Sequence, residues 1–262
     1  MRYVSPDRGS AASKDSETGA EGNMRIDRLL VERGLFESRA KAQAAIAAGR
    51  VTAGGVVVEK PSVEIAPDAQ LRAEPAHPFV SRGGVKLAAA LDHFRFDPKG
   101  RICLDVGASA GGFTQVLLAR GARHIYAVDV GRGQLHPSLR AQTSVVSLEG
   151  ADIRELTAAR LQTTVDFIAI DVSFISLAQV LPAALALARP GAHLVGLIKP
   201  QFEAGPRAAK KGVVRDGAVH AAVCEKLSAL VQSLGWRVGG VIPSPISGRD
   251  GNREFLIGAA RD

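Results

Sequence analysis

From residue 81 to the end of the chain, short apolar segments alternate with helical segments, and this alternation restricts the folds that the chain can form. The expected strands cover residues 102–106, 124–128, 145–148, 167–171, 193–198, 237–242 and 255–259, and the expected helices cover residues 113–120, 177–188 and 218–234. Strands that are apolar throughout are typical of sheets buried on both faces by helices. The pattern predicts an α/β fold with a doubly wound, mostly parallel sheet, in which ligands bind at the carboxyl ends of the strands. The last two strands are expected to pair as an antiparallel edge.

A smaller unit with a different pattern precedes this region. Between residues 24 and 60, an apolar stripe predicts a helix that stops at Gly34, and Ser38 is expected to cap a second helix that ends at Gly49. Gly54 and Gly55 lie between two β-branched runs, which predicts a hairpin. These elements indicate a small α+β domain.

The composition divides the chain into four parts. Residues 1–23 are polar and are expected to be disordered, and we expect their removal to leave stability and activity intact. Residues 24–65 are expected to form the small domain and residues 81–262 the large one. Residues 66–80 contain Pro67, Pro75 and Pro78 and are expected to be a linker.

The overall charge favours an anionic partner. The formal net charge is +7 and the sequence pI is about 9.8. Nucleic acid is the commonest partner of such a protein, although a basic surface that serves only solubility gives the same values. Cys103 and Cys224 lie in apolar stretches, which argues against a disulfide framework and fits a reducing compartment.

The sequence offers no sign of a membrane or metal function. It has no apolar run near the ~20 residues of a membrane span and no apolar signal-peptide core. Its six histidines lack metal-ligand spacing, so no metal is predicted. We therefore expect a cytoplasmic protein.

A glycine-rich stretch from Asp105 to Thr114 follows the first expected strand of the large domain and opens a helix. Its glycines allow a sharp turn and a close approach to a ligand, but Gly107 and Gly111 are four residues apart, whereas a dinucleotide fingerprint needs spacings of two and then three. Asp129 ends the next strand, where a carboxylate can bind ribose hydroxyls, and Asp152 follows the third, where an adenine would lie.

These acids favour S-adenosylmethionine, which carries a positive sulfonium and no phosphate. A nicotinamide dinucleotide and a tight turn without any ligand are the alternatives. The expected cofactor-binding residues are Asp105, Gly107, Gly111, Gly112, Phe113, Asp129, Asp152 and Asp171.

Ordered motifs across the large domain resemble the TlyA family of ribosomal-RNA 2'-O-methyltransferases, often labelled hemolysins, within the FtsJ-like group. The matching stretches are residues 81–87, 105–114, 129–135, 171–177, 197–203, 212–216, 244–246 and 251–256. Residues 25–30, 38–40, 49–51 and 60–61 resemble the S4-like RNA-binding domain that this family carries. The resemblance implies a Rossmann-like methyltransferase sheet, S-adenosylmethionine as cofactor, ribosomal RNA or ribosomal subunits as partners, and cytidine as the target nucleoside.

The FtsJ-like group uses a Lys-Asp-Lys-Glu tetrad, and the motif match places it at Lys86, Asp171, Lys199 and Glu254. Asp171 and Lys199 each end an expected strand, so both should emerge at the cofactor edge of the sheet. A ribose 2'-hydroxyl is a weak nucleophile, and Lys199 is the best candidate to remove its proton or to stabilise its alkoxide. The sequence leaves these two roles open.

The small domain has seven Lys or Arg residues and four Asp or Glu residues between positions 24 and 60, and few aromatics. This favours recognition of the RNA backbone and shape over base stacking, although the charges could also be ordinary exposed ones. The expected RNA contacts are Arg25, Arg28, Arg39, Lys41, Arg50 and Lys60. The leading function is an RNA methyltransferase, and the alternatives are a non-catalytic RNA-binding or assembly factor and a membrane-lytic protein, for which no lytic helix is evident.

Overall fold

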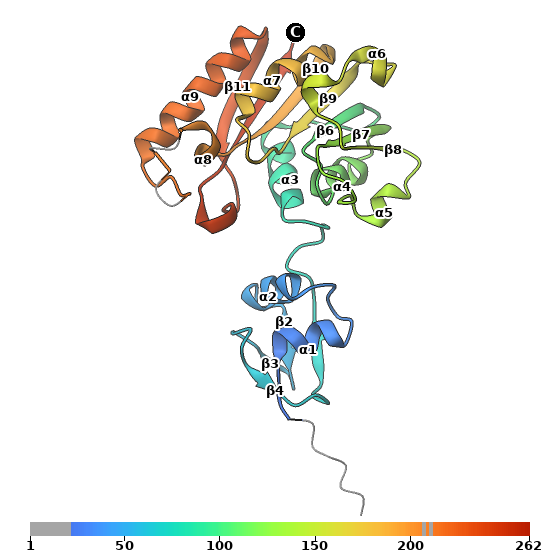
Figure 1. Ribbon diagram of the computed structural model, residues 1–262, viewed down its shortest axis with the longest axis vertical. Helices are drawn as coiled ribbons and strands as arrows, with labels where there is room; N and C mark the ends of the chain where they lie inside the picture. Colours follow the sequence, from blue (N-terminus) through green and yellow to red (C-terminus); the bar gives the residue numbers. More distant parts are fainter. Residues whose placement is uncertain (1–21, 206–207, 210–211) are drawn as a thin grey trace, which may run out of the picture. The chain divides into compact units, whose positions relative to one another are not determined.

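The computed structural model describes residues 22–205, 208–209 and 212–262, and the chain divides into two compact units between Pro78 and Phe79 (Figure 1). The expected disorder of residues 1–23 falls almost entirely outside the described residues. Each unit has its own hydrophobic core.

The first unit packs two short helices against small sheets. Its elements are β1 (Met24–Arg25), α1 (Ile26–Glu32), α2 (Arg39–Ala47), β2 (Val51–Ala53), β3 (Val56–Val57), β4 (Glu64–Ile65) and β5 (Leu71–Ala73). The Ser38 hydroxyl accepts a hydrogen bond from the Lys41 backbone N–H and caps α2, as predicted. Gly54 and Gly55 turn the predicted β2–β3 hairpin with φ values of 55° and 83°.

The expected linker, residues 66–80, is partly wrong, because it contains strand β5. β5 pairs antiparallel with β2, so β2 lies between β3 and β5 in a three-stranded sheet. The Glu74 backbone N–H also donates to the Arg50 carbonyl at 3.0 Å. The prolines at 67 and 75 flank this strand rather than interrupt it, and three residues are too few to show an alternating pattern.

The second unit is built on the seven-stranded sheet that the sequence predicts. The order β11-β12-β10-β9-β6-β7-β8 uses β6 (Ile102–Val106), β7 (His124–Asp129), β8 (Val145–Glu149), β9 (Val165–Ile170), β10 (Ala188–Ile198), β11 (Trp236–Pro243) and β12 (Phe255–Arg261). β6 to β10 run parallel to one another, whereas β12 runs antiparallel to both β10 and β11. The predicted antiparallel pair at the edge is therefore confirmed.

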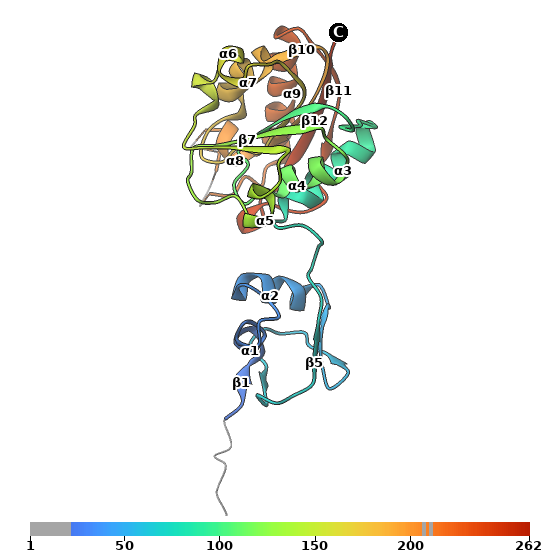
Figure 2. The ribbon, with the colours of Figure 1, turned by 90° about the vertical axis from the view of Figure 1, so that its right-hand side faces the viewer.

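Helices cover both faces of this sheet (Figure 2). They are α3 (Gly83–Phe94), α4 (Gly112–Ala119), α5 (Pro137–Arg140), α6 (Ala158–Leu161), α7 (Leu177–Ala186), α8 (Pro200–Glu203) and α9 (Gly217–Ser233), with 3-10 turns at Ile153–Glu155 and Arg249–Gly251. Alternate residues of β9 point to opposite faces: Phe167 packs in the core under α3 and α4, and Ile168 packs in the core under α7 and α9.

The strand order reverses beside β6. The chain passes from β6 outward to β7 and β8, and then returns across the sheet to β9 on the other side of β6. Such a switch point opens a crevice at the carboxyl ends of the two neighbouring strands. The loops after β6 and β9 therefore define where a ligand can bind.

Candidate active site

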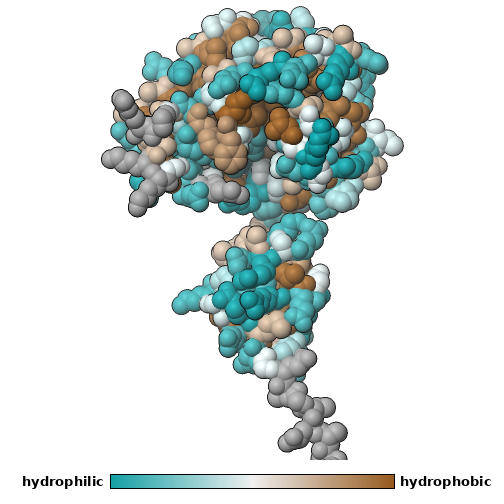
Figure 3. Space-filling view, viewed as in Figure 1, coloured by the Kyte–Doolittle hydropathy of each residue, from teal (hydrophilic) through white to brown (hydrophobic). Residues whose placement is uncertain are grey.

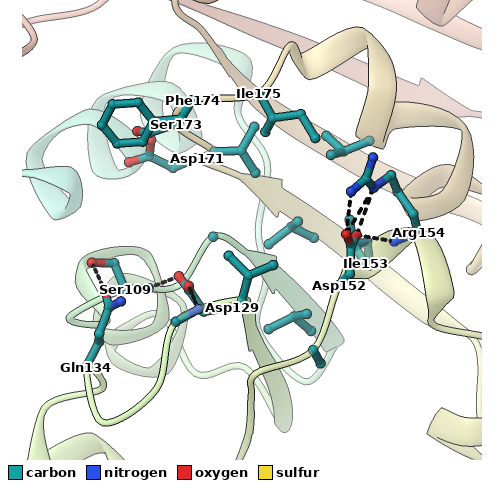
Figure 4. Close-up of a pocket in the computed structure, with 18 residues that line it drawn as sticks. Ser109, Asp129, Gln134, Asp152, Ile153, Arg154, Asp171, Ser173, Phe174 and Ile175 are labelled. Atoms are coloured by element: carbon teal, nitrogen blue, oxygen red, sulfur yellow. Dashed lines mark hydrogen bonds and ion pairs between the residues drawn. The ribbon is translucent and has the colours of Figure 1, made fainter.

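A cavity of about 740 Å³ lies at this switch point and is lined by the ends of β6, β7 and β9 and by the 3-10 turn after β8. Asp129, Asp152 and Asp171 approach it from three sides (Figure 4). Apolar side chains gather around a hollow in the larger unit (Figure 3), and the exposed Val130 and Phe174 are among the residues that line the cavity. A site of this size, mostly apolar with a few polar groups, is typical of a cofactor pocket.

Gly107 brings the loop after β6 into contact with the loop after β9. Its φ of +83° is in the left-handed region, and a Cβ atom at this position would lie 2.3 Å from the Asp171 carbonyl oxygen. The Asp171 backbone N–H donates to the Val106 carbonyl at 2.9 Å. Glycine at position 107 is therefore required for the two loops to meet.

Asp129 is held in place by backbone donors. Its Oδ2 accepts a hydrogen bond from the Ser109 N–H at 2.8 Å, and its Oδ1 accepts one from the Gly131 N–H at 2.7 Å. A carboxylate oxygen can accept two hydrogen bonds, so both oxygens can still bind ribose hydroxyls. The Ser109 hydroxyl also donates to Oε1 of Gln134 at 3.1 Å, which links the loops after β6 and β7.

Glu149 organises the loop that follows Asp129. Its Oε1 accepts hydrogen bonds from the backbone N–H groups of Gln134 at 2.8 Å and Leu135 at 3.0 Å. Backbone donors, the Leu135 N–H foremost, lower the pKa of this carboxyl to about 2. Nothing local in the sequence marks Glu149 for this role, since a glutamate at a strand end is usually solvated.

Asp152 lines the large cavity but is already paired. Nε of Arg154 lies 3.0 Å from Oδ1 and 3.1 Å from Oδ2, and the Arg154 backbone N–H donates to Oδ1 at 2.9 Å. The side-chain hydrogen bond from Arg154 lowers the pKa of Asp152. Asp152 is therefore an ionised acceptor with a fixed orientation.

A second cavity of about 170 Å³ adjoins the first. Lys199 and Phe113 line it, together with residues at the starts of α3 and α4, including Gly83 and Gly112. Both cavities are lined by Gly107, Ser109, Asp171 and Ser173. These four residues mark the junction where a group bound in one cavity can meet a group bound in the other.

Lys199 extends from the end of β10 to this junction. Its Nζ lies 2.6 Å from Oδ1 of Asp171 and donates a hydrogen bond to the Ser173 hydroxyl at 2.7 Å. The residue is only 9% exposed, so these two oxygens largely replace water around Nζ. The structure thus brings together two of the four residues that the motif match selected.

The other two, Lys86 and Glu254, form a second ion pair. Lys86 lies in the first turn of α3 and Glu254 lies immediately before β12, and both side chains are buried. A Cβ atom at Gly248 would lie 2.1 Å from Oε1 of Glu254, so the loop backbone presses on this carboxylate. Among the described residues, neither Lys86 nor Glu254 lines either of the two cavities.

Two residues expected to bind the cofactor support the loop instead of lining the cavities. Asp105 is fully buried in β6, where its Oδ2 accepts a hydrogen bond from the Thr114 hydroxyl. Burial raises the pKa of Asp105 to about 7. Gly111 has a φ of +94°, and a Cβ atom there would meet the side chains of Leu139 and Leu135.

Four of the six residues expected to bind RNA form ion pairs with acids of the first unit. Arg25 and Arg39 pair with Asp27, which is fully buried, at 3.1 and 2.7 Å, and a hydrogen bond from Arg25 holds the pKa of Asp27 far below its usual range. Two further residues expected to bind RNA, Lys41 and Arg50, pair with Glu37 and Glu74. The remaining two, Arg28 and Lys60, are exposed.

The part of the chain that the structure describes has neither a membrane-spanning helix nor a metal-binding cluster. No helix in the described ranges is long and apolar enough to cross a membrane. Within residues 22–205, 208–209 and 212–262, no cluster of three or more His, Cys, Asp or Glu residues could hold a metal ion.

The large cavity fits S-adenosylmethionine better than a dinucleotide. Three carboxylates and one arginine line it, so a cationic sulfonium is favoured and a pyrophosphate is repelled. The fixed Asp129 carboxylate and the close approach at Gly107 are what a bound nucleoside requires. Among the lining residues, Ser109, Gln134, Arg154 and Ser173 had been given no role from the sequence.

Comparisons with known proteins agree with this arrangement. A family model described as FtsJ-like methyltransferase matches residues 79–261, and one described as S4 domain matches residues 24–71. The chain is 44% identical over 236 residues to the 16S/23S rRNA (cytidine-2'-O)-methyltransferase TlyA of Mycobacterium tuberculosis, covering 89% of this chain and 88% of that protein. It is 35% identical to hemolysin A of Brachyspira hyodysenteriae, covering 89% and 98%. A solved structure from Streptococcus thermophilus is 39% identical, covers 92% of this chain and 90% of its own, and has a TM-score of 0.72.

Proposed function

The chain belongs to the FtsJ-like methyltransferase family, and on this premise we propose that it transfers a methyl group from S-adenosylmethionine to a ribose 2'-oxygen of ribosomal RNA, with cytidine as the target nucleoside. The junction of the two cavities carries this proposal, because Lys199 reaches it from one side and the cofactor cavity opens on the other. The S4 domain ahead of the catalytic domain supports RNA as the substrate.

In the large cavity, Asp129 would accept hydrogen bonds from the cofactor ribose, and Asp152 would accept one from the adenine amine. Asp171 would face the sulfonium end, since it lines both cavities. When bound, S-adenosylmethionine supplies an electrophilic methyl group. The protein's part is to hold the acceptor oxygen in line with that group and to exclude water.

Lys199 would act on the acceptor hydroxyl. The 2'-hydroxyl has to lose its proton as the new O–C bond forms, and a neutral Lys199 can accept that proton while a charged one can stabilise the alkoxide. In either role, Asp171 keeps the Nζ atom at the junction. The Lys86–Glu254 pair would support the site without lining it, because it holds the start of α3 beside the start of β12.

The first unit would bind the RNA backbone through its exposed cations. Arg28 and Lys60 are the best candidates for phosphate contacts, because Arg25 and Arg39 are engaged with the buried Asp27. The half-exposed guanidinium groups of those two arginines can still reach a phosphate while they hold Asp27.

Methyl transfer from labelled S-adenosylmethionine tests the proposal, with purified ribosomal subunits and naked ribosomal RNA as acceptors. The expected result is label at a ribose 2'-oxygen with the wild type and none with Lys199→Ala. Lys226→Ala is a matched control, because Lys226 is an exposed lysine of α9 away from both cavities, and it should transfer label like the wild type.

The outcome also separates the alternatives. A wild type that binds ribosomal RNA but labels none of these substrates would point to a non-catalytic RNA-binding factor. Label on a base nitrogen or carbon would support methyltransferase activity but contradict the ribose 2'-oxygen as its target. If Lys199→Ala transfers label at the wild-type rate, Lys199 takes no part in the reaction.

A further inference from the structure

Lys199 has two oxygen partners at nearly equal distances, and the family tetrad accounts for only one of them. Asp171 lies 2.6 Å from its Nζ atom, and the Ser173 hydroxyl lies 2.7 Å from it. Ser173 comes two residues after Asp171 and also lines both cavities. It therefore holds Lys199 at the place where the proposed reaction occurs.

We propose that Ser173 is a positioning residue for methyl transfer, whose hydroxyl fixes Nζ of Lys199 at the junction of the two cavities. This inference rests on the proposed function of the site. In this inference, Ser173 fixes the position of the Lys199 Nζ atom, whereas Asp171 supplies the negative charge beside it.

The chemistry of the hydroxyl suits this task. A lysine side chain carries its amine on one flexible four-carbon stem, so an ion pair alone leaves the amine free to move, whereas an ion pair and a hydrogen bond together restrict it. A hydroxyl both accepts and donates, so Ser173 can bond a charged or a neutral Nζ, and it adds no second negative charge. A displacement of about 1 Å at a reacting group can cost roughly 100-fold in rate.

The loop that carries Ser173 is itself anchored to the segment that carries Lys199. Beyond Ser173, the Ser176 hydroxyl and the Leu177 N–H both donate to the Glu203 carboxylate. Glu203 ends α8, which begins immediately after Lys199. Two contacts therefore join residues 173–177 to residues 199–203: the Lys199–Ser173 hydrogen bond and the Glu203 cap on α7. Together they restrict movement of one segment relative to the other.

Steady-state kinetics of Ser173→Ala and Ser173→Thr test the role. For Ser173→Ala we expect kcat to fall by roughly 10- to 100-fold, with KM for S-adenosylmethionine changed by less than about threefold. Ser173→Thr keeps a hydroxyl and should recover most of kcat. The matched control is Ser228→Ala on α9, where the hydroxyl bonds only its own helix at the Cys224 carbonyl, and kcat should not change. A loss confined to KM, or no rescue by threonine, would overturn the proposal.

Chemical labelling gives a readout that does not need turnover. An amine-reactive anhydride and mass spectrometry would compare the labelling rate of Lys199 with that of the exposed Lys60 in the same molecule. We expect Ser173→Ala to raise the relative rate for Lys199 several-fold and Ser173→Thr to leave it near the wild-type value. An unchanged rate in Ser173→Ala would contradict the inference even if the wild type methylates RNA. If the wild type transfers no methyl group, the proposed function fails, while the labelling still decides whether Ser173 holds Lys199.

Discussion

Lys86 and Glu254 are 168 positions apart in the chain and form an ion pair whose side chains are only 9% and 3% exposed. The pair joins the first turn of α3 to the residue before β12, and so ties the N-terminal and C-terminal ends of the catalytic domain together. A buried pair of this kind stabilises little by itself, but removal of one partner leaves an uncompensated charge in the interior.

We therefore expect Glu254→Ala to lower the free energy of unfolding by about 3–5 kcal/mol, as measured by urea denaturation. The double variant Lys86→Met/Glu254→Leu should be less destabilised than Glu254→Ala, because it leaves no charge behind, yet it should still be impaired in methyl transfer. Equal stability of Glu254→Ala and the wild type would show that Lys86 finds water or another partner.

Gly107→Ala should abolish binding of S-adenosylmethionine, measured by calorimetry. The new methyl group would meet the Asp171 carbonyl oxygen and force apart the two loops that form the cavity. Gly100→Ala is the matched control: Gly100 has a φ of +70° and nothing lies within 4 Å of its Cβ position. It should cost only the roughly 1–2 kcal/mol of a left-handed conformation and leave binding intact. If both variants lose binding equally, general destabilisation rather than the loop contact is responsible.

The Glu149 carboxyl should make stability depend on pH in the acid range. Its folded-state pKa of about 2 lies below the usual value of 4.5, so its contribution is fully present above about pH 5 and is lost as pH falls toward 2. The difference in unfolding free energy between the wild type and Glu149→Gln, followed from pH 7 to pH 2, should shrink over this window. A difference that is constant with pH would mean that the carboxylate charge has no part in holding residues 133–135.

In the first unit, we expect substitutions to distinguish residues that bind RNA from residues that stabilise the fold. Arg28→Ala should weaken RNA binding, and should reduce the slope of log affinity against log salt by about one, without changing stability. Arg39→Ala should lower stability by roughly 1.5–3 kcal/mol, because the buried Asp27 loses a charged hydrogen bond. Anisotropy titrations at several salt concentrations and urea denaturation measure the two effects. An Arg28→Ala variant with an unchanged salt slope would exclude a phosphate contact at that position.

Local features of the sequence were sufficient to predict the strands of the large sheet, three of its helices and the caps and hairpin of the small unit. An apolar segment such as residues 102–106 indicates a buried strand by its composition alone. Ser38 caps a helix and Gly54 and Gly55 turn a hairpin through contacts within a few residues, so the sequence predicts both features. The parallel sheet follows from the alternation of strands and helices, since a helix must return the chain to the same edge before the next parallel strand can begin.

Only the tertiary structure decided which charges meet and which polar groups are buried. Asp105 and Asp129 both lie on strands and look alike in sequence. Asp105, however, is buried in β6 and bonded to Thr114, whereas Asp129 lines the cavity. The tetrad separates into two ion pairs, and Ser173 joins one of them, because β9, β10 and β12 become neighbours only when the sheet forms. The strand β5 escaped prediction for the same reason: three residues carry no pattern, and their partner β2 lies about twenty positions earlier in the chain. Periodicity and capping act over a few residues, whereas ion pairs, sheet edges and cavities depend on contacts between distant segments.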